Sequence, residues 1–364
     1  MDLGKPEASG MRFMSLLHPL SPDPDNAAPI IGLGPSLAKA GKVVAVVVTH
    51  NRFAQLKQTI SALLAVPPPY LQGIVVVDNG SDDGSWGWLA SVQDPRILPL
   101  RHSKNLGGAG GFHAGLRAAV SLMDPDWVVV MDDDGRPDDG AIAAFHQTDL
   151  SGWDMVAAAV RYPDGAICEM NRPSRNPFWS VGAFWATARR GRSGFHIDPA
   201  HYADAMAPVQ VDVSSFVGLF ISRKTIDRIG YPDPSLFVYG EDGLYTLAAS
   251  KAGLRIGFFP HIRFTHDCTT FVARDRAFSE IWKAYYYHRN LLHLYRAAAG
   301  FWFWPVLGVI LPKWLWRITR QKHGRGRFAL ILALAIWDGL WGVRHRSHDQ
   351  VLRLSAAHRE RISR

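Results

Sequence analysis

The chain has 364 residues, of which 48% are hydrophobic and 20% are charged. This length corresponds to one large or two ordinary domains, and the apolar fraction excludes a wholly disordered protein. The two cysteines, Cys168 and Cys268, are too few for a disulfide framework or for a metal cluster held by cysteine alone. We therefore expect a reduced protein in the cytoplasm.

Positive charge is concentrated near the C-terminus. The net charge is +8, and the segment from Lys313 to Arg364 holds twelve Lys or Arg and three acidic residues, which leaves −1 for the other 312 residues. The same segment contains four tryptophans: Trp314, Trp316, Trp337 and Trp341. Basic segments that carry tryptophan are typical of anionic membrane surfaces. Nucleic acid is the competing partner for basic charge, but the apolar stretches here are too long for a phosphate-binding face.

The longest apolar runs are Gly300–Pro312 and Phe328–Val343. Both are shorter than a membrane span of about 20 residues, so they predict interfacial or buried helices. These helices would hold the protein on the inner face of the cell membrane, or would pair two copies of the chain. Before the first strand, the composition predicts a loose lead-in with one short element at Phe13–Leu17. The predicted organisation is therefore a lead-in (1–40), a central domain (41–275) and a C-terminal helical region (276–364).

Strands and helices alternate after residue 40. Continuous β-branched runs predict strands that are buried on both faces, as in a parallel sheet, and apolar residues at helical spacing predict helices between them. The expected strands are Val43–Val48, Ile74–Val77, Arg96–Leu100 and Trp127–Met131, and the expected helices are Ala54–Ala65, Trp86–Val92 and Gly111–Met123. This order predicts a doubly wound, mostly parallel α/β sheet whose ligands bind beyond the carboxyl ends of the strands.

Three acidic residues, Asp132, Asp133 and Asp134, directly follow the strand that ends at Met131. Three like charges at the end of a buried strand repel one another unless a cation lies among them. Carboxylate oxygens suit Mg²⁺ or Mn²⁺, ions that commonly bridge protein carboxylates and substrate phosphates. The alternative is a solvated acidic turn that leads into Gly135.

Two further segments favour a phosphate or nucleotide ligand. Asp78 ends the second strand, where a carboxylate can accept hydrogen bonds from a base or ribose, although Asn-Gly and Asp-Gly are also ordinary turn formers. The glycine-rich run from Asn105 to Gly111 precedes a helix, where backbone N–H groups approach a diphosphate or glycines allow close helix packing. The run fails the dinucleotide fingerprint, since His113 stands where a third glycine is needed, and a P-loop is absent.

Glu241 and Asp242 form an acidic pair at an expected helix start. Such a pair is favourable for the helix dipole without any further role, or it supplies a general base. His266 follows an apolar run and is either a structural histidine or a ligand.

Together these segments resemble an inverting, GT-A-fold nucleotide-sugar glycosyltransferase of the large family that includes cellulose and hyaluronan synthases. The matching pieces occur in the family's order: Val43–Arg52, Val75–Gly84, Asn105–Gly111, Asp132–Asp134, Glu241-Asp242 and a later Tyr285–Asn290 segment. The glycine run, the triple Asp and the Thr-His at 265–266 are most similar to bacterial galactofuranosyltransferases and related rhamnosyltransferases. The Gln-x-x-Arg-Trp motif of the processive synthases is absent.

The resemblance implies a role for each matched residue. Asp132, Asp134 and His266 would hold Mn²⁺ or Mg²⁺, Asp242 would be the base that activates the acceptor hydroxyl, and Glu241 would position the acceptor. The nucleotide-sugar would be surrounded by Thr49, Asn51, Arg52, Asp78, Asn105, Gly107, Gly108, Asp132 and Asp133. In the variable middle of the chain, Trp179, Phe184 and Trp185 would stack on the acceptor or pack in the core.

The implied reaction is the transfer of a sugar from a nucleotide diphosphate donor to a lipid-linked or cell-surface glycan. UDP-galactofuranose is the favoured donor, and dTDP-rhamnose is the alternative. A non-catalytic membrane scaffold of the same fold is disfavoured, because a scaffold need not keep a base beside a metal site. A nucleotidyltransferase is disfavoured because the segment after Thr49 lacks the glycines it would need.

Overall fold

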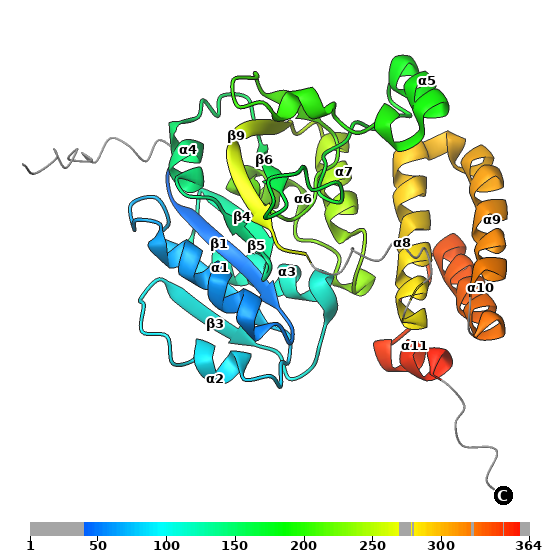
Figure 1. The fold of residues 1–364 in the computed structure, drawn as a ribbon, viewed down its shortest axis with the longest axis horizontal. Helices are drawn as coiled ribbons and strands as arrows, with labels where there is room; N and C mark the ends of the chain where they lie inside the picture. The colour runs from blue at the N-terminus through cyan, green and yellow to red at the C-terminus, as the bar shows by residue number, and fades with distance from the viewer. Residues whose placement is uncertain (1–39, 269–277, 279, 322–323, 345, 357–364) are drawn as a thin grey trace, which may run out of the picture. The chain divides into compact units, whose positions relative to one another are not determined.

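The computed structural model describes residues 40–268, 278, 280–321, 324–344 and 346–356. The predicted lead-in, with its short element at Phe13–Leu17, lies outside these residues. The described chain forms one sheet with helices around it, followed by a group of C-terminal helices (Figure 1).

One sheet organises the first two thirds of the chain. Its strand order is β3-β2-β1-β4-β8-β6-β9-β5, with β7 paired to β9. The strands are β1 (Val43–Thr49), β2 (Gly73–Asp78), β3 (Ile97–Arg101), β4 (Trp127–Asp132), β5 (Gly135–Pro137), β6 (Met155–Arg161), β7 (Val209–Val211), β8 (Leu219–Ser222) and β9 (Ile256–His266).

The half of the sheet built from β1 to β4 is entirely parallel. β1 pairs with β2 on one side and with β4 on the other, and β2 pairs with β3. Every residue of β1 and β2 is buried, as their continuous apolar runs predict. All four strands predicted from the sequence are present, and their carboxyl ends meet at one edge of the sheet.

The other half of the sheet is mixed. β8 is antiparallel to β4 and β6, whereas β6 and β9 are parallel. On its other side, the C-terminal end of β9 pairs antiparallel with the short β5, so that His266 lies opposite Gly135. This pairing brings His266 beside the acidic turn after β4, across 132 residues of sequence.

The helices of the sheet region are α1 (Phe53–Ala65), α2 (Ser85–Leu89), α3 (Gly107–Ala118), α4 (Ala141–Gln147), α5 (Val181–Arg190), α6 (Arg223–Ile229) and α7 (Glu241–Lys251). α3 begins four residues before the predicted start at Gly111, and a π-helical turn continues it to Met123. The glycines that disfavour a helix in isolation are those that let α3 lie against the sheet. A Cβ on Gly115 would meet Val46 Cγ1 at 2.5 Å, and one on Gly111 would meet Val48 Cγ1 at 2.4 Å.

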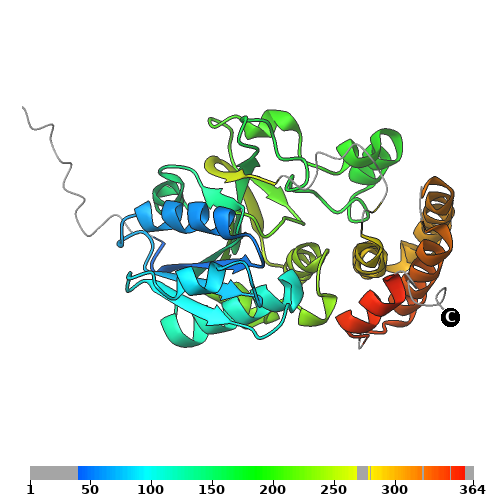
Figure 2. The same cartoon turned by 60° about the horizontal axis from the view of Figure 1, so that its bottom comes forward.

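In the described part of the C-terminal region, the α-helices are α8 (Ile281–Ala299), α9 (Phe303–Arg320), α10 (Arg325–Trp341) and α11 (His348–Ser355). α8, α9 and α10 lie side by side in both ribbon views (Figures 1 and 2) and share a hydrophobic core of their own. The helical stretch Ile281–Arg320 contains an 18-residue window that is apolar enough to cross a membrane, with a mean hydropathy of 1.4. The chain turns at Gly300 within that stretch, where φ is +53°, so α8 and α9 are separate helices.

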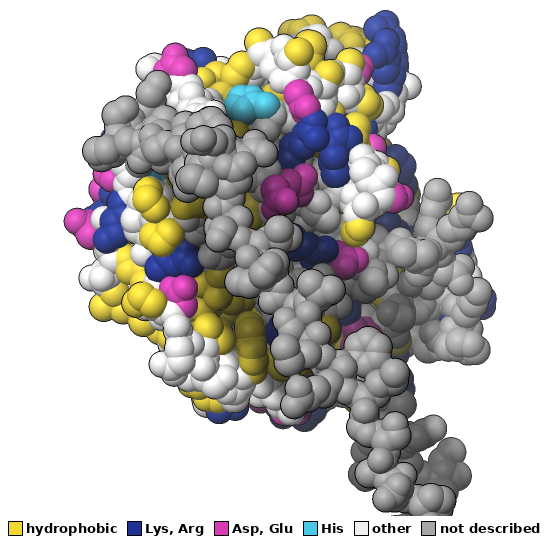
Figure 3. All heavy atoms as spheres, turned by 60° about the vertical axis from the view of Figure 1, so that its left-hand side comes forward, with side chains coloured by type: hydrophobic (Ala, Val, Ile, Leu, Met, Phe, Trp, Pro, Cys, Tyr) yellow, Lys and Arg dark blue, Asp and Glu magenta, His cyan; other side chains and the backbone are white. Residues whose placement is uncertain are grey.

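Charge of both signs is distributed over the face of the sheet region seen in Figure 3. On its visible part, Lys and Arg side chains lie among Asp and Glu side chains and hydrophobic ones. This mixture agrees with the near-neutral sum for the residues before Lys313.

Candidate active site

The predicted metal ligands converge at the carboxyl end of β4. Carboxylate oxygens of Asp132 and Asp134 and a ring nitrogen of His266 all lie within 4.8 Å of one another. Nε2 of His266 donates to Oδ1 of Asp134 at 3.0 Å, and Nδ1 donates to Oδ1 of Asn171 at 2.7 Å. Burial opposes the charged ring, but the hydrogen bond and charge of Asp134 raise the pKa of His266 to about 10.

Asp133 turns in the opposite direction, toward β1. Its Oδ2 accepts a hydrogen bond of 2.7 Å from Thr49, and the hydroxyl of Thr59 donates to its backbone carbonyl, also at 2.7 Å. Arg52 pairs with Asp134 and, at 3.5 Å, with Asp133. Thr49 and Arg52 are therefore engaged with the acidic turn itself, next to the predicted nucleotide position.

The electrostatics of the acidic turn are those of a site with excess negative charge. Burial and the charge of Asp134 raise the pKa of Asp132 to about 6, against the opposing effect of His266 and Arg52. Burial raises the pKa of Asp133 to about 7. Asp134 is the exception, because His266 and Arg52 outweigh burial and lower its pKa.

Glu241 and Asp242 open α7 and face the same cluster. Burial and the charge of Asp242 raise the pKa of Glu241 well above its ordinary value, and Asp132 adds to that rise. Burial likewise raises the pKa of Asp242, whose Oδ1 accepts the backbone N–H of Gly243 at 2.6 Å. Glu241 Oε2 is buried and has no hydrogen-bond partner among the described residues. We call Asp132, Asp133, Asp134, Glu241 and Asp242 the acidic cluster.

The loop before α7 has an unusual backbone. Phe237 and Tyr239 have positive φ values of +66° and +68°, and Gly240 follows at +85°. Positive φ at two aromatic residues is costly and persists only where the surroundings hold it. The loop also lies against α3, since the Ala109 N–H donates to the Phe237 carbonyl at 3.1 Å and a Cβ on Gly107 would meet that carbonyl oxygen at 2.0 Å.

Two buried side chains of α8 hold this loop. Asn290 Nδ2 donates to the carbonyls of Leu236, Val238 and Tyr239 at 2.8–2.9 Å. Arg289 Nη2 donates to the carbonyls of Ser235 and Leu236, at 2.9 and 3.0 Å. We call Arg289 and Asn290 the α8 clamp. It ties the C-terminal helices to the loop that sets the position of Glu241 and Asp242.

The remaining predicted donor-binding residues lie around the ends of β1 and β2. Asp78 is buried and accepts the Ser81 N–H at 2.9 Å through Oδ1, while its Oδ2 lies 3.6 Å from Nε of Arg101. Asn51 has a φ of +53° and caps the neighbouring turn through a hydrogen bond from Asp82 N–H. Asn105 accepts the N–H of Gly107 at 2.7 Å. Gly108 lies against Glu241, since a Cβ there would meet Oε1 of Glu241 at 2.9 Å.

The aromatic residues expected near the acceptor lie apart from the core. Trp179 and Trp185 are 44% and 53% exposed, and Phe184 is also exposed. Trp185 and Phe184 belong to α5, which has no buried residue. Core packing is therefore excluded for these three side chains, and an acceptor contact stays a prediction.

Sequence reasoning missed several residues that shape the site. Asn171 orients His266, Thr59 anchors the acidic turn, and the contacts of the α8 clamp with the loop were not foreseen. The Tyr285–Asn290 segment is one of the pieces that resemble the family, but nothing in its spacing indicates which carbonyls Asn290 would reach. Asn171 lies outside any helix or strand, between β6 and α5, so no sequence periodicity indicates its position.

The possible metal ligands Asp132, Asp134 and His266 fit a hard divalent cation. Two carboxylates and an imidazole nitrogen are close enough to share one ion, and the neighbouring buried carboxylates leave the cluster short of positive charge. The Asp134 carboxylate already pairs with two cationic groups, the His266 ring through Nε2 and the Arg52 guanidinium. Oxygen-rich sites of this kind suit Mg²⁺ and Mn²⁺.

Comparison with known proteins identifies relatives along the region that builds this site. The sequence profile of glycosyl transferase family 2 matches residues 44–204. Galactofuranosyltransferase GlfT1 of Mycolicibacterium smegmatis is 32% identical over 231 residues, which cover 63% of this chain and 72% of that protein. GlfT1 of Mycobacterium tuberculosis is 29% identical over 236 residues, or 62% and 70% of the two chains. Among solved structures, the mannosyltransferase PcManGT from Pyrobaculum calidifontis in complex with GDP-Man and Mn²⁺ aligns over 85% of this chain and 89% of that one, with 15% identity and a TM-score of 0.49.

Proposed function

The chain belongs to glycosyl transferase family 2, and we propose that it transfers galactofuranose, with inversion, from UDP-galactofuranose to a hydroxyl of a lipid-linked glycan. The choice of sugar is supported by the similarity to the two GlfT1 proteins. The observation that carries the chemistry is the acidic cluster, which brings two candidate metal-binding carboxylates within electrostatic reach of a buried candidate base.

In this proposal Asp132, Asp134 and His266 would hold Mn²⁺ or Mg²⁺ at the carboxyl end of β4. A bound divalent cation supplies Lewis-acid stabilisation of the departing nucleoside diphosphate. Arg52, beside Asp134, adds a fixed positive charge at the same edge of the sheet. The nucleotide lies over the ends of β1 and β2, where Thr49, Asn51, Asp78, Asn105, Gly107, Gly108 and Asp133 surround it.

Asp242 takes the proton of the acceptor hydroxyl as the oxygen attacks the anomeric carbon in line with the leaving group. Its raised pKa makes the carboxylate a stronger base than an exposed aspartate, which suits proton abstraction near neutral pH. Glu241, next to it on α7, hydrogen-bonds the acceptor and sets its orientation. The loop held by the α8 clamp fixes both carboxylates relative to β4.

The C-terminal helices bind an anionic membrane surface in this proposal, on the cytoplasmic side. Phe301, Trp304, Trp337 and Trp341 are 89%, 66%, 60% and 68% exposed, which is unusual for side chains of this size. Arginine accompanies them, with the Arg320 guanidinium 3.8 Å from the ring centroid of Trp316. Exposed tryptophan together with basic charge favours the headgroup region of anionic lipids over a dry protein interface.

Membrane binding is tested by co-sedimentation with vesicles of phosphatidylglycerol and phosphatidylcholine. Replacing Trp337 and Trp341 by serine is expected to reduce the bound fraction, whereas the matched change Trp185→Ser on α5 leaves it unchanged. Equal binding by both variants would contradict the assignment of this surface. A concentration-dependent change in mass without vesicles would instead assign the helices to a dimer.

The transfer reaction is tested by a donor screen with Mn²⁺ or Mg²⁺ and a polyprenyl-diphosphate glycan acceptor. UDP-galactofuranose, dTDP-rhamnose, UDP-galactose and UDP-glucose are offered to the protein and to Asp242→Asn, and nucleotide release is measured. The expected result is release from UDP-galactofuranose that is lost in Asp242→Asn. Release from dTDP-rhamnose alone would identify rhamnose, and not galactofuranose, as the transferred sugar. Binding of donor or metal without turnover in either protein would favour the non-catalytic membrane scaffold.

A further inference from the structure

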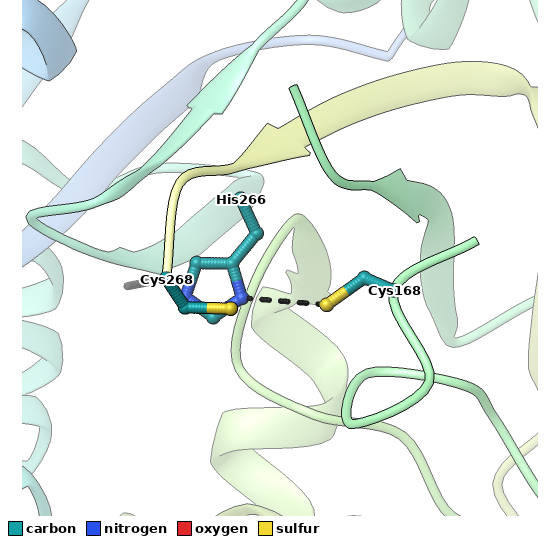
Figure 4. A group of neighbouring side chains, drawn as sticks. All are labelled: Cys168, His266 and Cys268. Atoms are coloured by element: carbon teal, nitrogen blue, oxygen red, sulfur yellow. Dashed lines mark hydrogen bonds between the residues drawn. The ribbon is translucent and has the colours of Figure 1, made fainter. Parts of the chain in front are cut away.

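The two ring nitrogens of His266 face different surroundings. Nε2 points to Asp134 in the acidic cluster. Nδ1 lies on the opposite side of the ring, 3.8 Å from the sulfur of Cys168, with Cys268 beside the same ring (Figure 4). Nothing in the proposed transfer reaction uses either thiol.

The fold brings the three residues together from separate segments. Cys168 follows β6 and is buried, and its N–H donates to the Val160 carbonyl at 3.1 Å. Cys268 stands two residues after the end of β9 and is partly exposed, with its sulfur 3.4 Å from the sulfur of Met170. The site is thus enclosed on the Cys168 side and reachable from the Cys268 side.

The spacing of the donor atoms matches that of a tetrahedral centre. The sulfurs of Cys168 and Cys268 and a nitrogen of His266 all lie within 4.8 Å of one another. In tetrahedral zinc sites, with their usual bond lengths, two sulfurs are about 3.8 Å apart and a sulfur and a nitrogen about 3.6 Å. Movements of less than about 1 Å therefore suffice to bring all three atoms onto one ion.

We propose that Cys168, Cys268 and Nδ1 of His266 form a binding site for Zn²⁺, on the side of the ring that faces away from Asp134. Two thiolates and an imidazole select a thiophilic cation, whereas the acidic cluster offers oxygen ligands to a hard one. The amide oxygen of Asn171 lies 2.9 Å from the Cys168 sulfur and 2.7 Å from Nδ1, so it is the neighbouring oxygen that could complete the ligand set. Binding releases the two thiol protons and the proton on Nδ1.

Occupation of this site has a consequence for the acidic cluster. A neutral imidazole has one nitrogen lone pair, so a ring that binds Zn²⁺ through Nδ1 keeps its remaining proton on Nε2. That proton then donates to Asp134, and the nitrogen is lost as a ligand for the hard cation. Loss of an outer-shell partner alone typically weakens metal binding by ~10–100-fold, so loss of a direct ligand is expected to weaken Mn²⁺ binding by at least that factor. The two sites therefore compete for one histidine, and Zn²⁺ acts as an inhibitor.

The test uses Co²⁺ as the probe, because cobalt bound to thiolate shows charge-transfer absorption that cobalt bound to oxygen and nitrogen alone lacks. The full chain is reduced with a phosphine, its free thiols are counted, and Co²⁺ is added to one equivalent. Thiolate-to-cobalt absorption is expected in the unmodified protein and in Asp134→Asn. It is expected to disappear in Cys168→Ser and in Cys268→Ser, and when Zn²⁺ is added.

The two serine variants keep the test independent of folding failure, since Cys268 is partly exposed and tolerates replacement more readily than buried Cys168. Circular dichroism checks each variant before titration. No thiolate absorption in a folded, fully reduced protein would overturn the proposal, and so would absorption that survives in a folded Cys268→Ser. Mn²⁺ binding followed by electron paramagnetic resonance then measures the competition, which is expected in the unmodified protein and absent from Cys268→Ser. None of these readouts requires transferase activity, so failure of the proposed function leaves the test intact.

Discussion

Two buried polar groups of this molecule differ in how their charges are balanced. Among the described residues, Arg52 and His266 are the cations that act on the acidic cluster, and burial raises the pKa of Asp132, Asp133, Glu241 and Asp242. In the C-terminal helices, the carboxylate of Asp338 accepts hydrogen bonds from Tyr285 and Arg346. Burial opposes its ionised form there too, but those partners lower the pKa of Asp338.

The difference separates a structural role from a chemical one. A buried charge whose partners are all supplied by the chain stabilises one arrangement and leaves nothing for a ligand. A group of buried carboxylates with too few cations is unstable alone and gains most from a cation brought by a ligand. Buried aspartate therefore has a chemical role in the acidic cluster and a structural role at Asp338, and substitution experiments can distinguish these roles.

The largest expected effect comes from the hard-cation ligands. Asp134→Asn is expected to reduce nucleotide release by ~10³-fold, because several kcal/mol of leaving-group stabilisation is lost. Chelation by EDTA should have the same effect on the unmodified protein, and added Mn²⁺ should restore it. Stopped assays before and after metal addition measure both. An Asp134→Asn protein that responds to Mn²⁺ as the unmodified protein does would place the cation elsewhere.

A smaller effect is expected when the α8 clamp is broken. Asn290→Ala removes the donor to the Val238 and Tyr239 carbonyls, which costs about 1–3 kcal/mol of stability. The released loop displaces Glu241 and Asp242, so kcat should fall by up to ~10²-fold. Lys283→Ala is the matched control, since Lys283 pairs with Glu280 at the surface of the same helix. Denaturant unfolding measures the loss of stability, and single-turnover assays measure the fall in kcat. An unchanged kcat would show that the α8 clamp does not contribute to catalysis.

The pH dependence of turnover should reflect the burial of Asp242. Burial raises the pKa of this carboxyl above its ordinary value of 3.8, and a general base acts only when ionised. Activity should therefore fall on acidification at a higher pH than an exposed aspartate would produce. A pH–rate profile at saturating donor measures this limb, and full activity down to pH values near 4 would contradict the assignment.

The smallest effect is expected on stability, from Glu241→Gln. The pKa of Glu241 is raised by burial and by Asp242, so its ionised form opposes folding at neutral pH. That penalty grows as the pH rises from the ordinary carboxyl range through the raised pKa. Replacement by neutral glutamine should raise the unfolding midpoint while acceptor transfer falls. Asp338→Asn is the opposite case, because it removes the partner of Arg346 and should lower the midpoint. Differential scanning calorimetry compares the two, and a lower midpoint for Glu241→Gln would contradict the balance of charges described here.

Much of the sheet could be predicted, because its order depends on local signals. The β-branched runs at Val43–Val48 and Trp127–Met131 predict buried parallel strands, and the GT-A arrangement expected from the motif order is confirmed. The limits of α3 could not be predicted as well, since the four glycines between positions 107 and 111 disfavour a helix locally, and their close contacts with the sheet and the loop before α7 are long-range. The mixed half of the sheet depends on pairings such as Gly135 with His266, which no local pattern reveals.

The candidate site also combines residues that local sequence predicts with residues that only long-range packing places. Asp132, Asp134 and His266 come together as predicted, because Asp132 ends β4, Asp134 follows it by two residues, and the Thr-His at 265–266 is part of the family resemblance. Thr49 and Arg52 were expected at the nucleotide, and in the structure Thr49 donates to Asp133 and Arg52 pairs with Asp134 of the acidic turn. Asn171 and the contacts of the α8 clamp depend on residues more than 50 positions away in sequence, so their positions follow from packing alone.

The most direct test makes one substitution, aspartate to asparagine, once in each region. Nucleotide release is measured for Asp242→Asn and Asp338→Asn, each corrected for its folded fraction and supplied with Mn²⁺, donor and acceptor. We expect Asp242→Asn to lose ~10²–10⁴-fold, the usual contribution of a general base, and Asp338→Asn to keep the rate of the unmodified protein. Equal rates for the two variants, with Asp242→Asn as active as the unmodified protein, would contradict the assignment of the acidic cluster as the catalytic centre.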